Sequence, residues 1–325
     1  MEKVISIILP VHNGAKYLSY TLNLIKDQIK RNTDCVDFIV CNNGSTDNTL
    51  QILKQIQEND TFFEIIDYAD KVPIGDSIYR SVSNASGKYV YLWGDDDIPS
   101  PFLIDSLLYY IRRYPNAGLF HFNFLRAKEK ELDYLGPVDS NNVNYFKESI
   151  EYTDIELYIN SFYLSMGFLS SLLFLREVWD RGCEYDNSTH YGYQFLFPLF
   201  FGLRDYTAVY ISFPLCLKRL PMGRQWVNRA PYYRFIGLPN LLYDLEKNRL
   251  IRDAGNVWHK TANNNKAFLA MMPQTCLDKS FFRKKLKEIY RYQDKRWRKV
   301  MTWIFINLFQ KETYLFVRRI IYRPK

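Results

Sequence analysis

Residues 85–97 read ASGKYVYLWGDDD, and this stretch decides the fold class. Tyr89–Trp93 is a short, wholly apolar run, which is typical of a strand buried on both faces of a parallel sheet. The run is followed by Asp95, Asp96 and Asp97, hereafter the acidic motif. In open α/β sheets the ligand crevice lies beyond the carboxyl ends of the strands, so the acidic motif is predicted to lie in such a crevice.

The sequence around the acidic motif alternates between predicted strands and predicted helices. Short apolar runs occupy residues 4–10, 36–41 and 63–68, and apolar residues at helical spacing occupy 17–30, 49–56 and 74–85. This alternation predicts an α/β fold with a Rossmann-like, mostly parallel sheet and helices on both faces. Beyond residue 115 we expect strands at 118–124 and 209–213, a helix at 149–163, and a strand beginning at 172 before a turn at 180–182.

Several classes of protein are excluded by missing patterns. No GxGxxG follows the first strand and no GxxxxGK[ST] is present, which argues against a dinucleotide oxidoreductase and a P-loop protein. The five cysteines are scattered without CxxC spacing, which favours a reduced, cytoplasmic compartment over a disulfide framework or a zinc site. The N-terminal apolar stretch is too short for a signal peptide, and no run approaches the roughly 18 apolar residues of a membrane-spanning helix.

The net charge of +8 is distributed unevenly. Residues 279–325 carry a net charge of +12, and the rest of the chain carries −4. In this tail Lys and Arg alternate with Trp, Phe, Tyr and Ile, which is typical of a helix that lies on an anionic membrane surface. Packing of the tail on the body and binding of nucleic acid are the alternatives, but the acidic body removes most of the case for nucleic acid.

Three adjacent carboxylates repel one another unless a cation lies among them. A solvated turn or a helix N-terminus is the plain alternative, since Asp is common there. Few basic residues stand near the acidic motif in the sequence, and Mn²⁺ or Mg²⁺ favours carboxylate oxygens and commonly bridges to substrate phosphates. We therefore expect Asp95 and Asp97 to hold such a metal, which would neutralise a departing diphosphate.

Three motifs at predicted strand ends carry a family resemblance: PVHNG at 10–14, NNGSTDNT at 42–49 and GDDD at 94–97. Together they resemble family 2 glycosyltransferases of the GT-A fold. The GDDD form and the segment GFLSSLLFLREVW at 167–179 are most similar to O-antigen-type transferases of deoxy- or dideoxyhexoses, such as abequosyltransferases. The resemblance implies a GT-A domain over residues 1–220. The pattern of the remaining residues predicts a helical, basic, membrane-proximal extension over 221–325.

The resemblance also implies roles for residues at matching positions. Those expected to bind the nucleotide sugar are Pro10, Val11, Asn13, Asn43, Asp47, Gly75, Asp76, Asp95 and Asp96, and those expected to hold the metal are Asp95 and Asp97. Asn42 departs from the family pattern, which usually has Asp there, so the nucleobase stays open. Arg219, Arg224 and Trp226, in the stretch RLPMGRQW, are hypothesised to close over the diphosphate or the acceptor.

Inverting members of this family use a carboxylate to deprotonate the acceptor hydroxyl, commonly in a Glu-Asp pair well beyond the acidic motif. Here residues 183–190 read CEYDNSTH and contain no such pair. Asp186, Glu184 and His190 are all chemically capable of acting as the base. For each one taken singly, an ordinary polar loop residue is the favoured alternative. Asp186 is favoured because the usual base of the family is a carboxylate.

The resemblance implies an inverting, metal-dependent transfer of one sugar from a nucleotide-sugar donor to a lipid-linked oligosaccharide. The pathway would be surface polysaccharide biosynthesis, at the inner face of the cell membrane. Two other functions are considered. A nucleotidyltransferase usually needs a glycine-rich, basic loop after the first strand, and HNGAKYL at 12–18 is a poor match. A catalytically degenerate relative that serves as a binding or assembly partner would fit the missing Glu-Asp pair.

Overall fold

The structure is a computed structural model of the chain. It describes residues 3–128, 149–162, 165–185, 192–220, 228–261, 265–293 and 295–315. The chain divides into two compact units. The first comprises Met1–Ser188 with Gln194–Pro221, and the second comprises Thr189–Tyr193 with Met222–Lys325.

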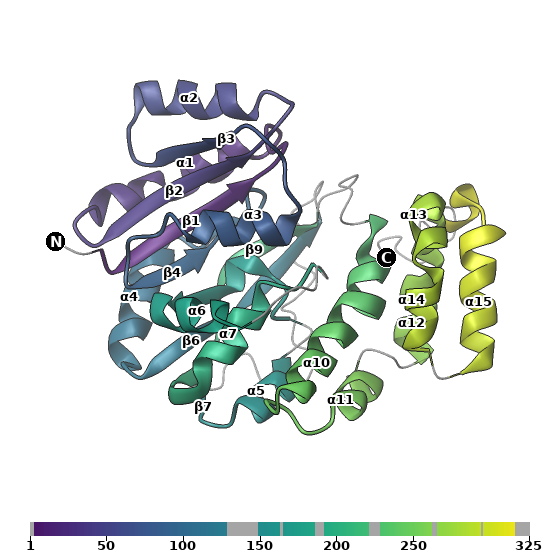
Figure 1. The fold of residues 1–325 in the computed structure, drawn as a ribbon. Helices are drawn as coiled ribbons and strands as arrows, with labels where there is room; N and C mark the ends of the chain where they lie inside the picture. Colours follow the sequence, from purple (N-terminus) through teal and green to yellow (C-terminus); the bar gives the residue numbers. More distant parts are fainter. Residues whose placement is uncertain are drawn as a thin grey trace. The chain divides into compact units, whose positions relative to one another are not determined.

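The first unit is built on one mixed sheet (Figure 1). Its strands are β1 (Ile5–Val11), β2 (Val36–Asn43), β3 (Glu64–Tyr68), β4 (Tyr89–Leu92), β5 (Ile98–Pro99), β6 (Ala117–Lys128), β7 (Ile150–Tyr152), β8 (Leu172–Leu175) and β9 (Thr207–Leu220). They are ordered β3-β2-β1-β4-β8-β6-β9-β5, and β7 pairs with β9. β3, β2, β1 and β4 run parallel, as do β6 and β9, whereas β8 is antiparallel to both of its neighbours.

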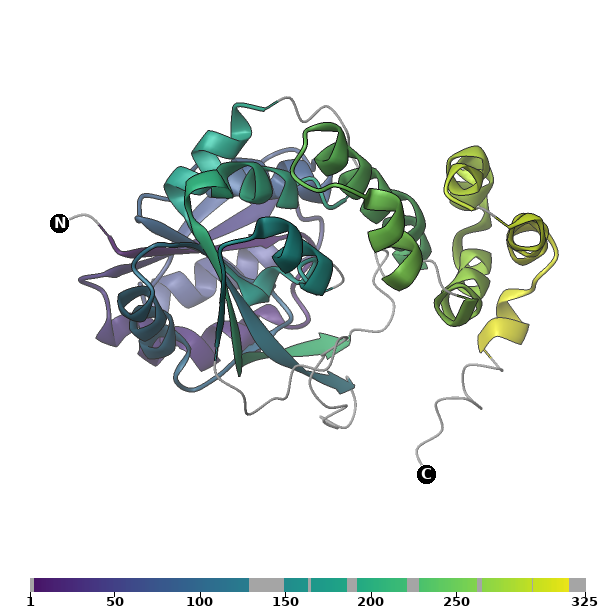
Figure 2. The same ribbon diagram turned by 90° about the horizontal axis from the view of Figure 1, so that it is seen from below.

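Helices cover both faces of this sheet. They are α1 (Leu18–Arg31), α2 (Thr49–Asn59), α3 (Ile74–Val82), α4 (Leu103–Arg113), α5 (Ile155–Phe162), α6 (Arg176–Cys183) and α7 (Leu196–Gly202). Figures 1 and 2 show α1 and α4 on one face and α3 and α6 on the other. Since both faces are covered, every residue of β1 and β4 is buried, which explains why all of them except Ser6 are apolar. The predicted α/β fold with helices on both faces is confirmed.

Two predicted elements are wrong. The helix expected over 149–163 begins only at Ile155, because Ile150–Tyr152 instead form a strand against β9. The turn expected at 180–182 lies within α6. There Gly182 lets the backbone of α7 come close, since a Cβ at this position would stand 1.9 Å from the carbonyl oxygen of Pro198. Tertiary packing overrides local preference at both places.

The second unit is helical, as predicted for the C-terminal region. Its elements are α9 (Ala230–Tyr232), a π-helix (Tyr233–Gly237), α10 (Leu238–Lys247), α11 (Ala254–Thr261), α12 (Asn265–Met271), a 3₁₀ helix (Met272–Asp278), α13 (Lys279–Lys284), α14 (Leu286–Arg291) and α15 (Arg296–Asn307). Phe235 lies at the centre, with its ring edge-to-face against Trp258 and Phe268. Along the stretches that the structure describes, no helix is both long and apolar enough to cross a bilayer.

Candidate active site

The acidic motif follows β4 directly and is buried. The side chains of Asp95, Asp96 and Asp97 are 5%, 9% and 4% exposed. Asp95 faces the loop between β1 and α1, where a Cβ at Gly14 would lie 2.4 Å from Asp95 Oδ2. Asp97 instead accepts a hydrogen bond of 2.6 Å from Ser170 Oγ. The motif therefore stands at the carboxyl end of the central strand, as the sequence predicts.

Burial raises the pKa of Asp97 well above its ordinary value, and the neighbouring charge of Asp96 acts in the same direction. The hydrogen bond from Ser170 and the positive charge of Lys218 oppose this rise in the pKa, and Asp95 adds to it. A buried carboxylate beside two others is costly to keep ionised unless positive charge lies close by. The site is thus suited to a cationic or metal-bound ligand.

Two basic residues at the end of β9 lie beside the acidic motif. Lys218 packs over the ring of Phe168, with Nζ 4.7 Å from the ring centroid. Arg219 Nε donates a 3.1 Å hydrogen bond to the backbone carbonyl of Asp96, and its guanidinium lies 5.0 Å from the ring centroid of Tyr17. Few basic residues are near the acidic motif in the sequence, but the fold brings Lys218 and Arg219 to it. In the folded chain, two cations stand beside the acidic motif.

The donor set fits a divalent cation of the magnesium type. In the described parts of the chain, no three His, Cys, Asp or Glu side chains converge into a metal-binding cluster. Asp95 and Asp97 face different neighbours, so they do not form an all-protein cage. Mg²⁺ and similar ions are usually bound by only one or two carboxylates, with waters and substrate phosphates completing the shell. Buried carboxylate oxygens at the carboxyl end of a central strand match that pattern.

Side chains of the first two strand-end loops bind each other in what we call the loop clasp: Asn13, Thr46, Asp47 and Thr49. Asn13 has a left-handed backbone conformation, with φ of 54°, and its Oδ1 accepts a 2.8 Å hydrogen bond from the amide of Thr46. Asp47 accepts from the amides of Thr49 (3.0 Å) and Ala15 (3.3 Å). Asn13 and Asp47, predicted to bind nucleotide, thus hold the two loops together.

Burial tends to raise the pKa of the Asp47 carboxyl, but the hydrogen bonds from Thr49 and Ala15 outweigh it and leave that pKa lowered. Asp47 is therefore ionised at neutral pH, which strengthens the hydrogen bonds it accepts. The loop clasp fixes the β1–α1 loop, and this loop carries Gly14 against Asp95. The two loops and the acidic motif consequently form one connected arrangement.

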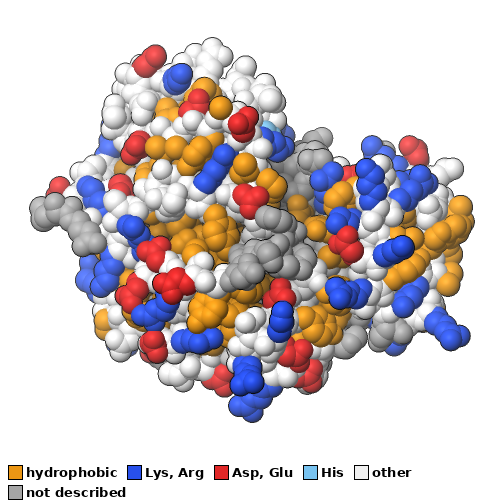
Figure 3. Space-filling model, viewed as in Figure 1, with side chains coloured by type: hydrophobic (Ala, Val, Ile, Leu, Met, Phe, Trp, Pro, Cys, Tyr) orange, Lys and Arg blue, Asp and Glu red, His pale blue; other side chains and the backbone are white. Residues whose placement is uncertain are grey.

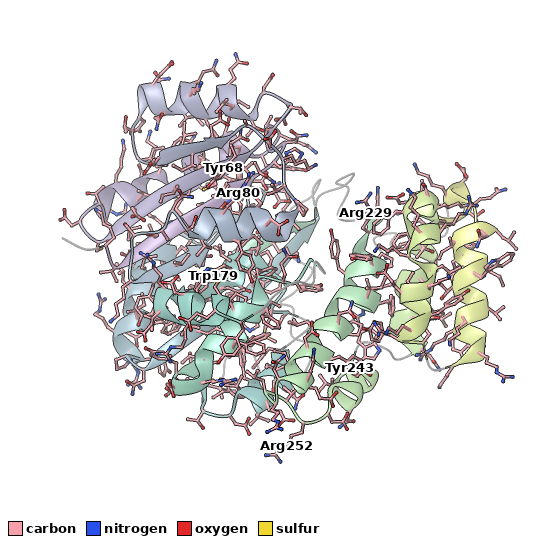
Figure 4. The ribbon with its side chains drawn as sticks, viewed as in Figure 1. Tyr68, Arg80, Trp179, Arg229, Tyr243 and Arg252 are labelled. Atoms are coloured by element: carbon pink, nitrogen blue, oxygen red, sulfur yellow. The ribbon has the colours of Figure 1, made fainter. Side chains whose placement is uncertain are left out.

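Asn43 and Arg80 form a second cluster at the end of β2. Asn43 Oδ1 accepts from the amide of Val72 (3.0 Å) and from Arg80 Nη2, while Asn43 Nδ2 donates to the carbonyl of Val72 (3.0 Å). The guanidinium of Arg80 stacks 3.9 Å from the ring centroid of Tyr68 (Figure 4). The neighbouring Asn42 donates to Asp67 Oδ1 at 2.7 Å. Asn43 therefore orders the segment between β3 and α3.

Gly75 and Asp76 lie in the first turn of α3. Gln194 Nε2 donates a 2.9 Å hydrogen bond to Asp76 Oδ1, and its side chain occupies the space beside Gly75, where a Cβ would stand 2.0 Å from it. Tyr79 Oη donates to the carbonyl of Gln194 at 3.2 Å. Gln194 carried no signal in the sequence because it lies more than a hundred residues from the helix that it contacts.

The remaining predicted site residues are placed as follows. Pro10 and Val11 end β1 and are buried, with Val11 against Gly14. Glu184 is exposed and caps the C-terminus of α6. Asp186, His190, Arg224 and Trp226 lie outside the described residues.

Comparison with known proteins identifies relatives of this chain. The profile described as glycosyl transferase family 2 matches residues 6–173. Abequosyltransferase RfbV of Salmonella typhimurium is 29% identical over 235 residues, which are 66% of this chain and 66% of that enzyme. Glycosyltransferase GlyG of Streptococcus pneumoniae is 27% identical over 107 residues, 33% of this chain and 35% of that protein. The chain thus spans about two thirds or less of the length of these relatives.

Among solved structures, TarS of S. aureus (residues 1–349) matches with a TM-score of 0.56 and 13% identity. The match covers 97% of this chain and 92% of that chain. The same part of TarS in complex with UDP-GlcNAc also matches with a TM-score of 0.56. The fold of nearly the whole chain therefore resembles that of a solved structure.

Proposed function

Because the chain belongs to glycosyl transferase family 2, as its motifs predict, we propose that it transfers one sugar from a nucleotide-sugar donor to an acceptor hydroxyl, with inversion at the anomeric carbon. One observation carries the proposal. Three buried carboxylates end the central strand β4 and lie beside the β1–α1 loop and two cations of β9. This is a setting for a sugar diphosphate at the carboxyl edge of the sheet.

Asp95 and Asp97 are proposed to hold Mn²⁺ or Mg²⁺, and Asp96 to contact the donor. The bound ion would supply positive charge to the leaving diphosphate. Lys218 and Arg219 supply further fixed positive charge on the same side. Because Arg219 is already anchored on the carbonyl of Asp96 and on Tyr17, little reorganisation is needed when negative charge develops.

The nucleotide is proposed to lie over the ends of β1 and β2 and the start of α3. The residues proposed to line this pocket are Pro10, Val11, Asn13, Asn43, Asp47, Gly75 and Asp76. Since Asn13, Asn43 and Asp47 use side-chain atoms to bind neighbouring loops, we propose that they act mainly by fixing the backbone that meets the nucleotide. Arg224 and Trp226 are proposed to close over the diphosphate or the acceptor.

The base that removes the acceptor proton is proposed to come from residues 184–190, with Asp186 first and Glu184 and His190 as alternatives. The base would take the hydroxyl proton as the acceptor oxygen attacks the anomeric carbon and the bond to the diphosphate breaks. Glu184 follows α6 at an exposed position, where an acceptor could reach it.

Two similar proteins bear on the choice of donor. The similarity to the Salmonella abequosyltransferase supports a deoxyhexose and a place in O-antigen or other surface polysaccharide biosynthesis. The similarity to TarS, which has been solved in complex with UDP-GlcNAc, supports a nucleoside diphosphate sugar of any kind. We propose a lipid-linked oligosaccharide as the acceptor, at the cytoplasmic face of the cell membrane.

The second unit offers a surface that would bring the enzyme to such an acceptor. One face of α15 packs against its own unit through Arg298, Thr302, Phe305 and Ile306. The apolar residues exposed on α15 and at its end are Trp297, Val300, Trp303 and Leu308. Figure 3 shows hydrophobic and basic side chains side by side over the α12–α15 region. Tryptophan and basic residues together favour the headgroup layer of an anionic bilayer, and we propose that α15 docks there.

Vesicle flotation of the full chain tests this docking. The protein should float with vesicles that contain phosphatidylglycerol and much less with pure phosphatidylcholine. Val300 and Trp303 are 58% and 46% exposed, so their joint replacement by Ser should abolish flotation without unfolding the chain. Leu157→Ser, on α5, removes an equally exposed apolar side chain and should change nothing. Equal flotation of all three proteins would contradict the docking.

Release of nucleoside diphosphate from a panel of nucleotide sugars, with and without Mn²⁺, tests the proposed activity. A glycosyltransferase should hydrolyse its preferred donor slowly in the absence of acceptor, and Mn²⁺ should accelerate this release. A degenerate binding partner would release no nucleoside diphosphate from any donor. A nucleotidyltransferase would instead consume a nucleoside triphosphate and sugar phosphate and release pyrophosphate.

A further inference from the structure

Ser170 is buried against the acidic motif although it lies 73 residues beyond Asp97 in the sequence. It belongs to a 3₁₀ turn, Leu169–Ser171, that leads into β8. β8 pairs antiparallel with β4, with Leu173 opposite Tyr91, so the start of β8 lies beside the end of β4. The side chain of Ser170 is completely buried. The sheet order itself therefore brings this hydroxyl to the acidic motif.

Ser170 Oγ has two hydrogen-bond partners, the amide of Gly94 and the carboxyl of Asp97. The amide of Gly94 can only donate, and it donates to Ser170 Oγ at 2.8 Å. When Asp97 is ionised its Oδ2 can only accept, so the hydroxyl proton of Ser170 goes to this oxygen at 2.6 Å. A hydroxyl that donates to a carboxylate makes a short, charge-assisted bond, as this distance indicates. Ser170 thus fixes Oδ2 and leaves Oδ1 as the carboxylate oxygen that would meet a ligand.

The backbone of Ser170 is fixed in turn. Its carbonyl accepts hydrogen bonds from Tyr91 Oη at 2.6 Å and from Cys216 Sγ at 3.2 Å. Gly94 leaves the space that the arrangement needs, since a Cβ there would lie 2.6 Å from Asp97 Oδ2 and 3.4 Å from Ser170 Oγ. Three strands thus fix the backbone of Ser170: β4 through Tyr91, β9 through Cys216, and β8 because it follows Ser170 directly in the chain.

We propose that Ser170 is a positioning residue: it sets the orientation of the Asp97 carboxylate for the metal-bound sugar diphosphate. This inference rests on the proposed function of the acidic motif. Without the hydroxyl, the carboxylate would rotate about its terminal torsion, which has a broad energy profile, and would present its oxygens to the ligand less consistently.

Ser171 provides a matched control. It is the next residue and is also completely buried, but its Oγ donates to the backbone carbonyl of Phe168 at 2.6 Å and not to the acidic motif. Ser170→Ala and Ser171→Ala each remove one buried hydroxyl from the same turn. A general loss of packing or hydrogen bonding would affect both variants alike, whereas a positioning role affects Ser170→Ala alone.

The experiment measures Mn²⁺ binding and donor hydrolysis on the full chain. Mn²⁺ is titrated by electron paramagnetic resonance in the presence of UDP, CDP, GDP or dTDP in separate samples. Thermal unfolding of each protein is recorded alongside. For Ser170→Ala we expect Mn²⁺ binding at least tenfold weaker, and a lower kcat for donor hydrolysis that raised Mn²⁺ only partly restores. Ser171→Ala should stay within twofold of the wild type in both measurements.

The outcomes separate this inference from the proposed function. If the wild type hydrolyses a donor and both variants match it, the positioning role is wrong and the function stands. If the wild type binds Mn²⁺ with a nucleotide but hydrolyses no donor, the function fails, and the binding comparison still decides the role of Ser170. Equal weakening of Mn²⁺ binding in both variants would overturn the inference, as would absence of Mn²⁺ binding to the wild type.

Discussion

The carboxylate of Asp95 lies so close to Gly14 that a Cβ added at position 14 would stand 2.4 Å from Asp95 Oδ2 and 2.5 Å from Val11 Cγ2. This approach joins the end of β1 to the end of β4, and it requires that residue 14 have no side chain. The contact connects a motif of the first strand with the acidic motif some eighty residues later.

Gly14→Ala is therefore expected to move Asp95 and to lower donor hydrolysis by at least tenfold, with a stability loss of about 1–3 kcal/mol from the forced contact. Gly255→Ala is the control, because a Cβ there meets nothing closer than 3.5 Å and Ala favours the helix α11. Thermal unfolding and hydrolysis rates check both variants. Full activity of Gly14→Ala would show that the contact has no functional role.

Thr49 connects the two halves of the loop clasp. Its fully buried hydroxyl accepts a 2.9 Å hydrogen bond from the amide of Gly14 and donates to Asp47 Oδ1. Thr49→Val keeps the shape but leaves the buried amide of Gly14 without its acceptor and removes one of the hydrogen bonds to Asp47, so the free energy of unfolding should fall by about 1–3 kcal/mol. Thr61→Val removes an exposed hydroxyl and should change it by less than about 0.5 kcal/mol. Urea unfolding measures both, and equal losses would contradict a specific role for the loop clasp.

Arg80 holds Asn43 and the carbonyl of Asp70 while its guanidinium stacks on Tyr68. Lysine has neither the planar fork nor the flat face for these contacts, so Arg80→Lys should raise the KM for the donor several-fold and change kcat less. Arg112→Lys, at an exposed position of α4, should leave both constants unchanged. Steady-state hydrolysis measures both constants. An unchanged KM in Arg80→Lys would show that Arg80 and Asn43 do not contribute to donor binding.

His121 makes stability depend on pH. It is completely buried in β6 among the rings of Tyr158, Phe162 and Tyr210, and burial lowers its pKa to about 3. The unfolded chain, with a histidine pKa of about 6.5, binds a proton below that pH that the folded chain does not bind. The free energy of unfolding therefore falls as the pH falls from about 6.5 toward 3.

Between pH 7 and pH 5 the wild type should lose about 2 kcal/mol more than His121→Phe, which removes the titrating group and keeps a ring among rings. Urea unfolding at the two pH values measures this difference. If both proteins lost the same free energy, His121 would not be the source of the dependence.

The sequence predicted the parallel half of the sheet well, and the reason is physical. β1 and β4 are buried on both faces, so all of their residues except Ser6 are apolar, and the turns after them carry polar motifs at fixed places. The prediction failed where a strand forms by pairing with a segment that is distant in the sequence. Ile150–Tyr152 form a strand only because β9 lies beside them.

The candidate site was predictable only in part for the same reason. Asp95, Asp96 and Asp97 can be recognised in the sequence because they form a charged run directly after an apolar strand. Ser170 and Lys218 reach the same place only because β8 and β9 follow β4 in the sheet, and nothing in their own sequence surroundings indicates it. The order of strands in the sheet places Ser170 and Lys218 at the acidic motif, and local sequence patterns do not encode that order.

The most direct test of the central claim is donor hydrolysis by Asp97→Asn in the presence of Mn²⁺, beside Asp105→Asn as the control at an exposed position of α4. Asp97→Asn keeps the size of the side chain and an oxygen for Ser170, and it removes a buried charge, so its melting temperature should not fall. We expect at least a thousandfold loss of hydrolysis for Asp97→Asn and wild-type rates for Asp105→Asn. A folded Asp97→Asn protein with full, Mn²⁺-dependent hydrolysis would contradict it.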